Sequence, residues 1–157
     1  MIRNFECFKV ESINDRYMIV SGIPKENGNR HASEISRLSL AFMRKIRQLR
    51  DESTLFPRIF PRIGIESGSA IGGVVGSKMP RFSLYGETVN LASQFEAESD
   101  PGRIQIGYNT KTLLELTEFG NYTIMQRGSI QIKGKGLVET FWLLDRKRID
   151  DFYSFQH

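Results

Sequence analysis

Two carboxylates lie close together in the stretch "KVESINDRYM", where Glu11 and Asp15 are four residues apart. The "INDR" segment predicts a tight turn between two short strands. A carboxylate on such a hairpin is a good ligand for Mg²⁺, which takes oxygen donors and binds through one or two carboxylates together with phosphates. Taken alone, Asp15 is more simply interpreted as a residue that stabilises its own turn.

Two lysines near the end of the chain could bind phosphates. In "IQIKGKG", Lys133 and Lys135 alternate with glycines, which let backbone and ammonium groups approach an anion. This signal is weak by itself, because hairpins with exposed lysines are common. The chain has neither a G-x-x-x-x-G-K-[ST] loop nor a GxGxxG segment, so P-loop and Rossmann sites are excluded.

A third stretch, "MPRFSLYGETVNLASQ", runs from Met79 to Gln94 and predicts a strand, a glycine turn and a helix. It carries the hydroxyl of Ser83 on the strand and the amide of Asn90 on the helix. Gln94 is neutral, although a phosphate-handling site would be expected to hold a cation at this point. The stretch is therefore either a working catalytic segment or a copy that has lost one part.

The elements that must position these residues alternate between strands and helices. Apolar residues at every third or fourth position predict a helix from Ala32 to Arg50 with Ser33 as its cap, and we interpret its basic outer face as solvated surface. Two strands, Arg62–Glu66 and Ala70–Val75, are expected to be joined by a tight Gly/Ser turn. Strands with Gly-rich turns follow near the end. This mixture favours an α+β sandwich whose helices cover one sheet.

The composition is that of one ordinary globular domain, 1–145, followed by a polar tail, 146–157, in a chain of 157 residues. The net charge of +4 suits a small polyanion such as a nucleotide and is too small to indicate nucleic-acid binding. The single cysteine, Cys7, excludes a disulfide framework, so a reducing compartment, the cytoplasm, is expected. No apolar run approaches the ~20 residues of a membrane span, so we expect no direct membrane insertion.

Together the three stretches resemble the catalytic domain of the class III nucleotidyl cyclases, and the guanylate cyclases in particular. From about Phe8 to Leu144 the chain carries, in family order, "KVE-x-I-x-D-x-YM-x-VSG-x-P", "RIGI-x-SG", "GVVG-x-KMPR-x-x-L-x-G-x-TVN-x-AS" and "RG-x-I-x-IKGKG". The resemblance implies a palm-like (ferredoxin-like) mixed sheet with helices packed on one face. It also implies a head-to-tail homodimer or heterodimer with another cyclase protomer, which converts GTP to cyclic GMP at composite sites. The domain could then be the intracellular part of a membrane-bound receptor.

In that family the position of Glu11 selects the purine. A carboxylate only accepts hydrogen bonds, which suits the N1–H and NH₂ groups of guanine and repels the N1 lone pair of adenine. Adenylate cyclases carry lysine there. Ser83 stands where guanylate cyclases usually have cysteine and adenylate cyclases often aspartate, and its hydroxyl does not decide the base. Arg81 matches an arginine that can brace the Glu11 carboxylate.

The resemblance assigns the phosphate chemistry to three further positions. Asp15 matches one of two carboxylates that hold two Mg²⁺ (or Mn²⁺) ions on the triphosphate. Asn90 matches the asparagine that orients the ribose, and Lys133 matches a lysine that binds the phosphates. The metals help the 3′-hydroxyl attack the α-phosphorus and let pyrophosphate leave.

Two departures from the family pattern concern this phosphate chemistry. Gln94 stands where the family has an arginine that stabilises the α-phosphate, and losing one such donor typically costs about 3 kcal/mol, or roughly 10²–10³ in rate. The family's first strand, with its second metal carboxylate, and the helix after it are also absent. We expect a guanylate cyclase, with a catalytically weakened nucleotide-binding or dimerising pseudo-cyclase as the alternative. An adenylate cyclase is opposed by Glu11.

Overall fold

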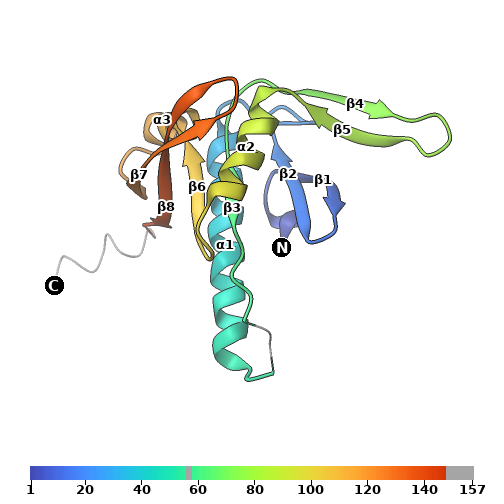
Figure 1. Ribbon diagram of the computed structural model, residues 1–157. Coiled ribbons are helices and arrows are strands. Elements are labelled where there is room, and N and C mark those ends of the chain that lie inside the picture. Colours follow the sequence, from blue (N-terminus) through green and yellow to red (C-terminus); the bar gives the residue numbers. More distant parts are fainter. Residues whose placement is uncertain (56–57, 148–157) are drawn as a thin grey trace.

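The computed structural model describes residues 1–55 and 58–147, so most of the predicted polar tail lies outside the described residues (Figure 1). Helical segments and strands alternate along the chain as the sequence predicts. The helical segments are η1 (Ile2–Asn4), α1 (Arg30–Glu52), α2 (Glu87–Glu98) and α3 (Tyr108–Thr117). The strands are β1 (Cys7–Ile13), β2 (Arg16–Ser21), β3 (Ile63–Ile65), β4 (Ile71–Val75), β5 (Arg81–Tyr85), β6 (Ile104–Gly107), β7 (Tyr122–Ile132) and β8 (Gly136–Arg146).

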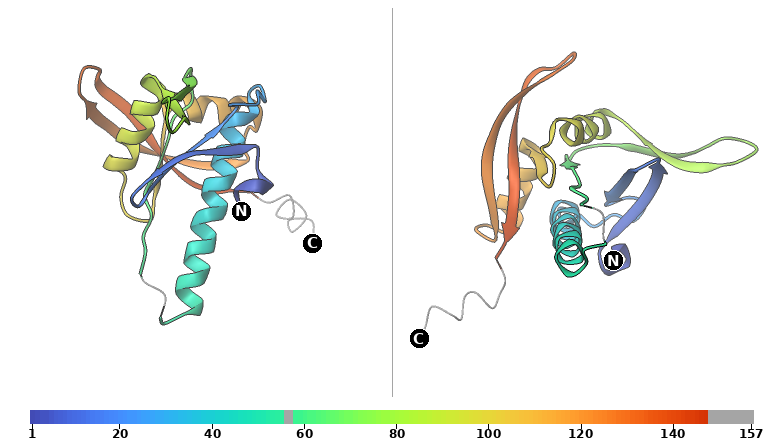
Figure 2. Two further views of the ribbon diagram at one scale, coloured as in Figure 1. Left: turned by 90° about the vertical axis from the view of Figure 1, so that its right-hand side faces the viewer. Right: turned by 60° about the horizontal axis from the view of Figure 1, so that its bottom comes forward.

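A four-stranded mixed sheet in the order β3-β6-β8-β7 forms the centre of the fold. Strand β3 runs parallel to β6, whereas β6 and β7 are both antiparallel to β8. The long β7–β8 hairpin confirms the one predicted from the Gly-rich turn (Figure 2). The β-branched residues Ile104 and Ile106 are 3% and 0% exposed, since both faces of β6 are covered.

Two further hairpins, β1–β2 and β4–β5, are separate from this sheet. The prediction that Arg62–Glu66 and Ala70–Val75 form one hairpin was wrong, because β3 pairs with β6 and β4 pairs with β5. The β4–β5 hairpin extends away from the body as an arm (Figure 1). In this arm, the side chains of Ile71 and Val74 are 74% and 72% exposed.

The helices bury apolar stripes against these strands. In α2, Leu91 and Phe95 pack with Ile130 and Ile132 of β7. Helix α2 approaches β3 closely because Gly64 has no side chain, and a Cβ there would collide with the α2 backbone. Helices α1 and α3 contact each other and β8.

The start of α1 differs from the prediction. The helix begins at Arg30 with Asn29 as the N-cap residue, whereas Ser33 lies inside the first turns, buried, and donates to the carbonyl oxygen of Arg30 at 3.2 Å. A serine that bonds back along its own helix is no longer available to cap it. None of the described helices is both long enough and apolar enough to cross a membrane.

The α+β class with a mixed sheet is confirmed. The strands, however, are divided into three groups. Among the described strands, β2 pairs only with β1, and β3 pairs only with β6. Each therefore keeps one edge without a strand partner in the described part of the chain, and such an edge can accept a further strand.

Candidate functional site

Helix α2 is the element around which the site segments gather. Asn90 and Gln94 are one turn apart and exposed, while Leu91 and Phe95 are buried on the neighbouring side of the helix. Residues four apart on a helix share one face, so the amide groups of Asn90 and Gln94 point into solvent side by side. The burial pattern of α2 thus fixes which face can meet a ligand.

The start of α2 is tied to the turn between β7 and β8. Lys135 Nζ forms an ion pair with the Glu87 carboxylate in the first turn of α2, where the helix dipole also favours a negative charge. None of the described carboxylates pairs with the neighbouring Lys133, which is exposed in the same turn. This ion pair brings Lys133 to the end of α2 that carries Asn90.

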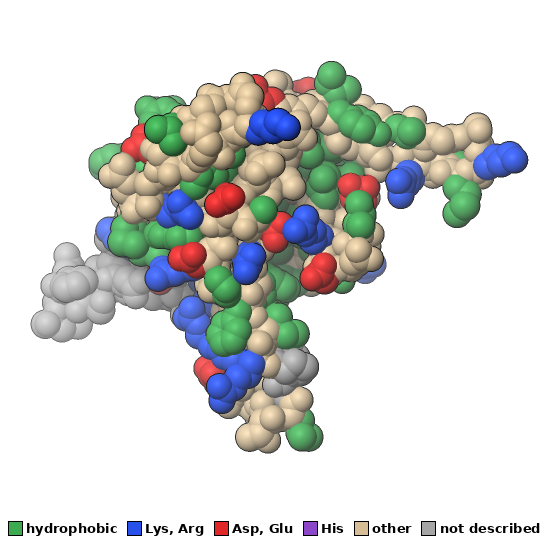
Figure 3. All heavy atoms as spheres, viewed as in Figure 1, with side chains coloured by type: hydrophobic (Ala, Val, Ile, Leu, Met, Phe, Trp, Pro, Cys, Tyr) green, Lys and Arg blue, Asp and Glu red, His purple; other side chains and the backbone are tan. Residues whose placement is uncertain are grey.

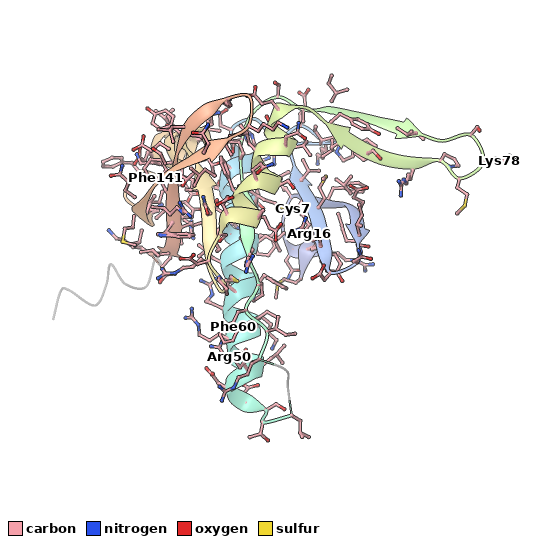
Figure 4. The ribbon with its side chains drawn as sticks, viewed as in Figure 1. Cys7, Arg16, Arg50, Phe60, Lys78 and Phe141 are labelled. Atoms are coloured by element: carbon pink, nitrogen blue, oxygen red, sulfur yellow. The ribbon has the colours of Figure 1, made fainter. Side chains whose placement is uncertain are left out.

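The turn that carries Asp15 is tied to the other end of α2. Asn14 adopts φ 53°, a left-handed conformation that asparagine tolerates in tight turns. The Asp15 carboxylate is exposed beside it. Arg16, the next residue, approaches the carboxylate of Glu96 on α2, with Nε and Oε2 3.6 Å apart (Figure 4). The turn that carries the predicted metal ligand is therefore linked to the end of α2 through Arg16.

An irregularity in β1 decides where Glu11 points. The pairing with β2 shifts between Lys9 and Glu11, so Phe8 faces Val20 and Glu11 faces Met18. In a regular strand, residues three apart would lie on opposite faces. The extra residue places Glu11 on the face of Phe8, whose ring meets Phe82 of β5 at a centroid distance of 5.8 Å. The bulge therefore turns the predicted purine-selecting carboxylate to the side of β1 that meets β5.

Arg81 and Ser83 share one face of β5, with Phe82 on the other. Ser83 is 8% exposed and lies opposite Gly73 of β4. A side chain at Gly73 would point to the same face, and a Cβ there would meet nothing within 4 Å. Because Gly73 has no side chain, open space remains beside the Ser83 hydroxyl. A planar ligand would need such space.

Sequence reasoning named seven site residues, of which two lie on α2, one on β1, two on β5 and one each in the β1–β2 and β7–β8 turns. Among the described residues, no hydrogen bond or ion pair joins any two of them, so Arg81 does not brace Glu11 within one chain. The seven are Glu11, Asp15, Arg81, Ser83, Asn90, Gln94 and Lys133.

A metal ion fits this chain only in part. The exposed turn carboxylate of Asp15 is the oxygen ligand that Mg²⁺ prefers. In residues 1–55 and 58–147 no group of three or more His, Cys, Asp or Glu side chains could hold a metal ion. Asp15 would thus supply one ligand of a metal site.

Sequence reasoning missed Glu66, a half-buried carboxylate at the end of β3. Its Oε1 accepts from the Ser67 amide at 2.8 Å and from Thr110 Oγ1 at 3.4 Å. Burial raises the pKa of Glu66 above its ordinary 4.5, and these hydrogen bonds only partly oppose the effect. In the sequence, the only signal for Glu66 was its position at the end of a predicted strand.

We predict that Glu66→Gln makes the protein more stable at neutral pH. Because the folded state raises the pKa of Glu66, it binds a proton more tightly than the unfolded chain does. Wild-type stability should therefore fall as the pH rises from about 4.5 through the folded pKa. The amide keeps the acceptor for Ser67 without the charge. Urea unfolding at a series of pH values measures this slope.

The matched control is Glu98→Gln, which changes an exposed carboxylate at the end of α2. This variant should keep the wild-type pH slope. An unchanged slope in Glu66→Gln would show that the Glu66 carboxylate is ionised without cost in the fold.

The only cysteine, Cys7, is half-buried at the start of β1. Burial raises the pKa of its thiol to about 11, and the Ser21 hydrogen bond only partly offsets this. The thiolate needed for nucleophilic chemistry is therefore scarce at neutral pH. Cys7 is therefore a packing residue rather than a nucleophile.

Comparison with known proteins identifies the family. The sequence model of the adenylate and guanylate cyclase catalytic domain matches residues 1–145. The chain belongs to this cyclase family. The resemblance carried by the motifs around Glu11, Asp15, Asn90 and Lys133 is thereby confirmed.

Curated members of the cyclase family are closely similar in sequence. Guanylate cyclase 32E of Drosophila melanogaster is 43% identical over 94% of this chain. Human atrial natriuretic peptide receptor 2 is 41% identical over 94% of the chain, and mouse retinal guanylyl cyclase 2 is 42% identical over the same share. The chain spans only 13–14% of the length of these relatives.

Solved cyclase structures share the fold. The guanylate cyclase domain of RhGC from Catenaria anguillulae, in complex with GTP, has a TM-score of 0.77 and 28% identity. The match covers 92% of this chain and 76% of that one. The catalytic core of a rhodopsin-guanylyl cyclase with converted specificity, in complex with ATPαS, has a TM-score of 0.76 and 27% identity, covering 92% of this chain and 74% of that one.

Proposed function

We propose that this chain is a guanylate cyclase catalytic domain, which converts GTP to 3′,5′-cyclic GMP and pyrophosphate at a site in a dimer interface. The observation that carries the choice of base is Glu11, turned by the β1 bulge to the side of β5. Its carboxylate offers only acceptors, which match the two donors on the guanine edge. The relatives named guanylate cyclases support the same choice.

Each side chain has a defined task in this reaction. Ser83 would donate its hydroxyl to guanine O6, beside the open space over Gly73. Asn90 would hold the ribose so that its 3′-hydroxyl faces the α-phosphorus, and the ammonium group of Lys133 would bind the phosphates. Asp15 would hold a divalent cation, which when bound neutralises charge on the triphosphate.

The site would be composite. Among the described residues, no hydrogen bond or ion pair joins any two of the seven side chains, so we expect a partner protomer to complete the site. The exposed Ile71 and Val74 of the β4–β5 arm offer apolar surface for such a partner. A strand joining the open edges of β2 and β3 would supply the second metal carboxylate. Homodimers and heterodimers both satisfy these requirements.

Gln94 favours a second candidate function. A nucleotide-binding pseudo-cyclase would keep Glu11 and Asn90 while losing the cation of the phosphate site. We rank this below the enzyme because Asp15 and Lys133 are also retained. The adenylate cyclase alternative is opposed by the acceptor-only Glu11.

The proposed location is the cytoplasmic side of the cell, where a reducing environment keeps Cys7 as a thiol. Among the relatives, one is named a natriuretic peptide receptor. The same assignment therefore holds for a soluble cyclase and for the intracellular domain of a receptor.

The test of the proposal measures cyclic GMP formed from GTP with Mn²⁺. The purified chain alone should be a poor cyclase, because Asp15 is its one assigned metal carboxylate and Gln94 stands in place of the arginine that stabilises the α-phosphate. Mixed with a metal-competent guanylate cyclase protomer, it should contribute a working site, and Asn90→Ala in this chain should reduce the signal about 100-fold or more. Robust turnover by the chain alone would contradict the account of the metal site. A mixed dimer that binds GTP but gives no product would favour the pseudo-cyclase.

A further inference from the structure

The positive charge of this chain is concentrated in one projecting segment. Residues 44–62 carry six basic side chains and two acidic ones, a net +4. The whole chain is also +4, with 22 basic and 18 acidic residues, so the rest of the molecule is neutral in sum. The six cations are Arg44, Lys45, Arg47, Arg50, Arg58 and Arg62.

Of these residues, 44–52 belong to α1, 53–55 follow its end, and 58–62 lead into β3. Figure 1 shows α1 extending below the strands, whereas the β4–β5 arm extends to the right from the top of the molecule. In Figure 3, Lys and Arg side chains gather over this end. Within residues 1–55 and 58–147, no carboxylate forms an ion pair with Lys45, Arg47, Arg58 or Arg62, and all four are exposed. Their charge is therefore available to a partner.

Apolar side chains lie among and beyond these cations. Leu55, three residues beyond the end of α1, is 93% exposed, and Ile59 and Phe60 are 44% and 50% exposed. The guanidinium group of Arg50 lies over the Phe60 ring, with Cζ 4.9 Å from the centroid (Figure 4). Such a contact keeps the ring at the surface beside a cation that can turn outward to an anion.

We propose that the projection formed by the described residues 44–55 and 58–62 docks on an anionic lipid bilayer. The order of its side chains suits a membrane, since the exposed Leu55 lies beyond the end of α1 and the cations Lys45 and Arg47 lie within the helix, as acyl chains lie beneath a layer of negative headgroups. An acidic protein would supply the charge but would not require an exposed apolar residue beyond the end of the helix. This surface is independent of the nucleotide site, since Asp15, Ser83 and Asn90 lie on other elements.

The test is sedimentation of the purified chain with lipid vesicles. Vesicles of phosphatidylcholine containing about one-third phosphatidylserine should bind the protein at low salt, and neutral phosphatidylcholine vesicles should not. Lys45→Ala with Arg47→Ala should weaken the binding about 30-fold, because each cation near an anionic surface contributes about fivefold. Leu55→Ser should weaken it about tenfold or more, and this exposed side chain makes no packing contribution to lose.

The matched control removes the same charge elsewhere, by Lys25→Ala with Lys78→Ala. Both lysines are exposed, and Lys78 lies at the tip of the β4–β5 arm (Figure 4). The control should bind anionic vesicles as the wild type does. An equal loss in the control, or binding that Leu55→Ser leaves unchanged, would overturn the proposal. So would absence of vesicle binding together with binding to polyglutamate, which would assign the surface to an acidic protein.

Discussion

Replacing Glu11 by lysine and Ser83 by aspartate should move the nucleotide preference from GTP to ATP. In the wild type, the Glu11 carboxylate accepts from guanine N1–H and NH₂, and adenine would place its N1 lone pair against it. The lysine would donate to adenine N1, and the aspartate would accept from the N6 amino group. Sites built to hydrogen-bond a substrate group reject an analogue that lacks it by up to roughly 10⁴–10⁵-fold, so the ratio of the two affinities should change by several orders of magnitude.

Competition binding of GTP and ATP to the dimer measures this change. Ser83→Asp alone should lower GTP affinity without giving good ATP binding, because the Glu11 carboxylate would still repel adenine N1. Ser83→Ala should weaken GTP binding modestly and leave the order of preference unchanged. A wild-type protein that binds ATP better than GTP would contradict the assignment of Glu11.

The local elements were predictable because their signals are local. The apolar periodicity identified α1 to within two residues at each end, and the Gly-rich turn at Lys133 identified the β7–β8 hairpin. The pairing of β4 was not predictable in the same way. A Gly/Ser turn suggested a hairpin with β3, whereas the long-range packing of β3 on β6 and α2 takes that strand into the central sheet.

The direction of Glu11 could not be predicted from the alternation of residues in β1. No glycine or proline marks the bulge after Lys9, and a regular strand would have turned Glu11 away from the face of Phe8. The motif identified Glu11 as a site residue, but only the irregular pairing of β1 with β2 turns its side chain toward β5. The basic face of α1 was likewise interpreted as ordinary solvated surface. Only the structure shows that its end extends beyond the strands and concentrates the charge (Figure 1).

Gln94→Arg should raise turnover in a dimer that already holds metal ions. Gln94 lies one helical turn after Asn90 on the exposed face of α2. If Asn90 orients the ribose, residue 94 faces the α-phosphate, where negative charge grows in the transition state. A guanidinium group there would stabilise that charge more than the ground state, so kcat should rise by roughly 10²–10³ while KM for GTP changes less.

The comparison pairs wild-type and Gln94→Arg chains with a metal-competent cyclase protomer and measures kcat and KM. Asn109→Arg is the matched control, since it also replaces an exposed amide side chain by arginine, but on α3 rather than on the Asn90 face of α2. A rise in both variants would indicate general electrostatic attraction of GTP and would appear in KM. An unchanged kcat for Gln94→Arg, in a complex shown to be dimeric and metal-loaded, would mean that position 94 does not face the reacting phosphate. The neutral residue would then mark a helix that has kept the ribose contact and given up the phosphate contact, which is the pattern of a nucleotide-binding partner.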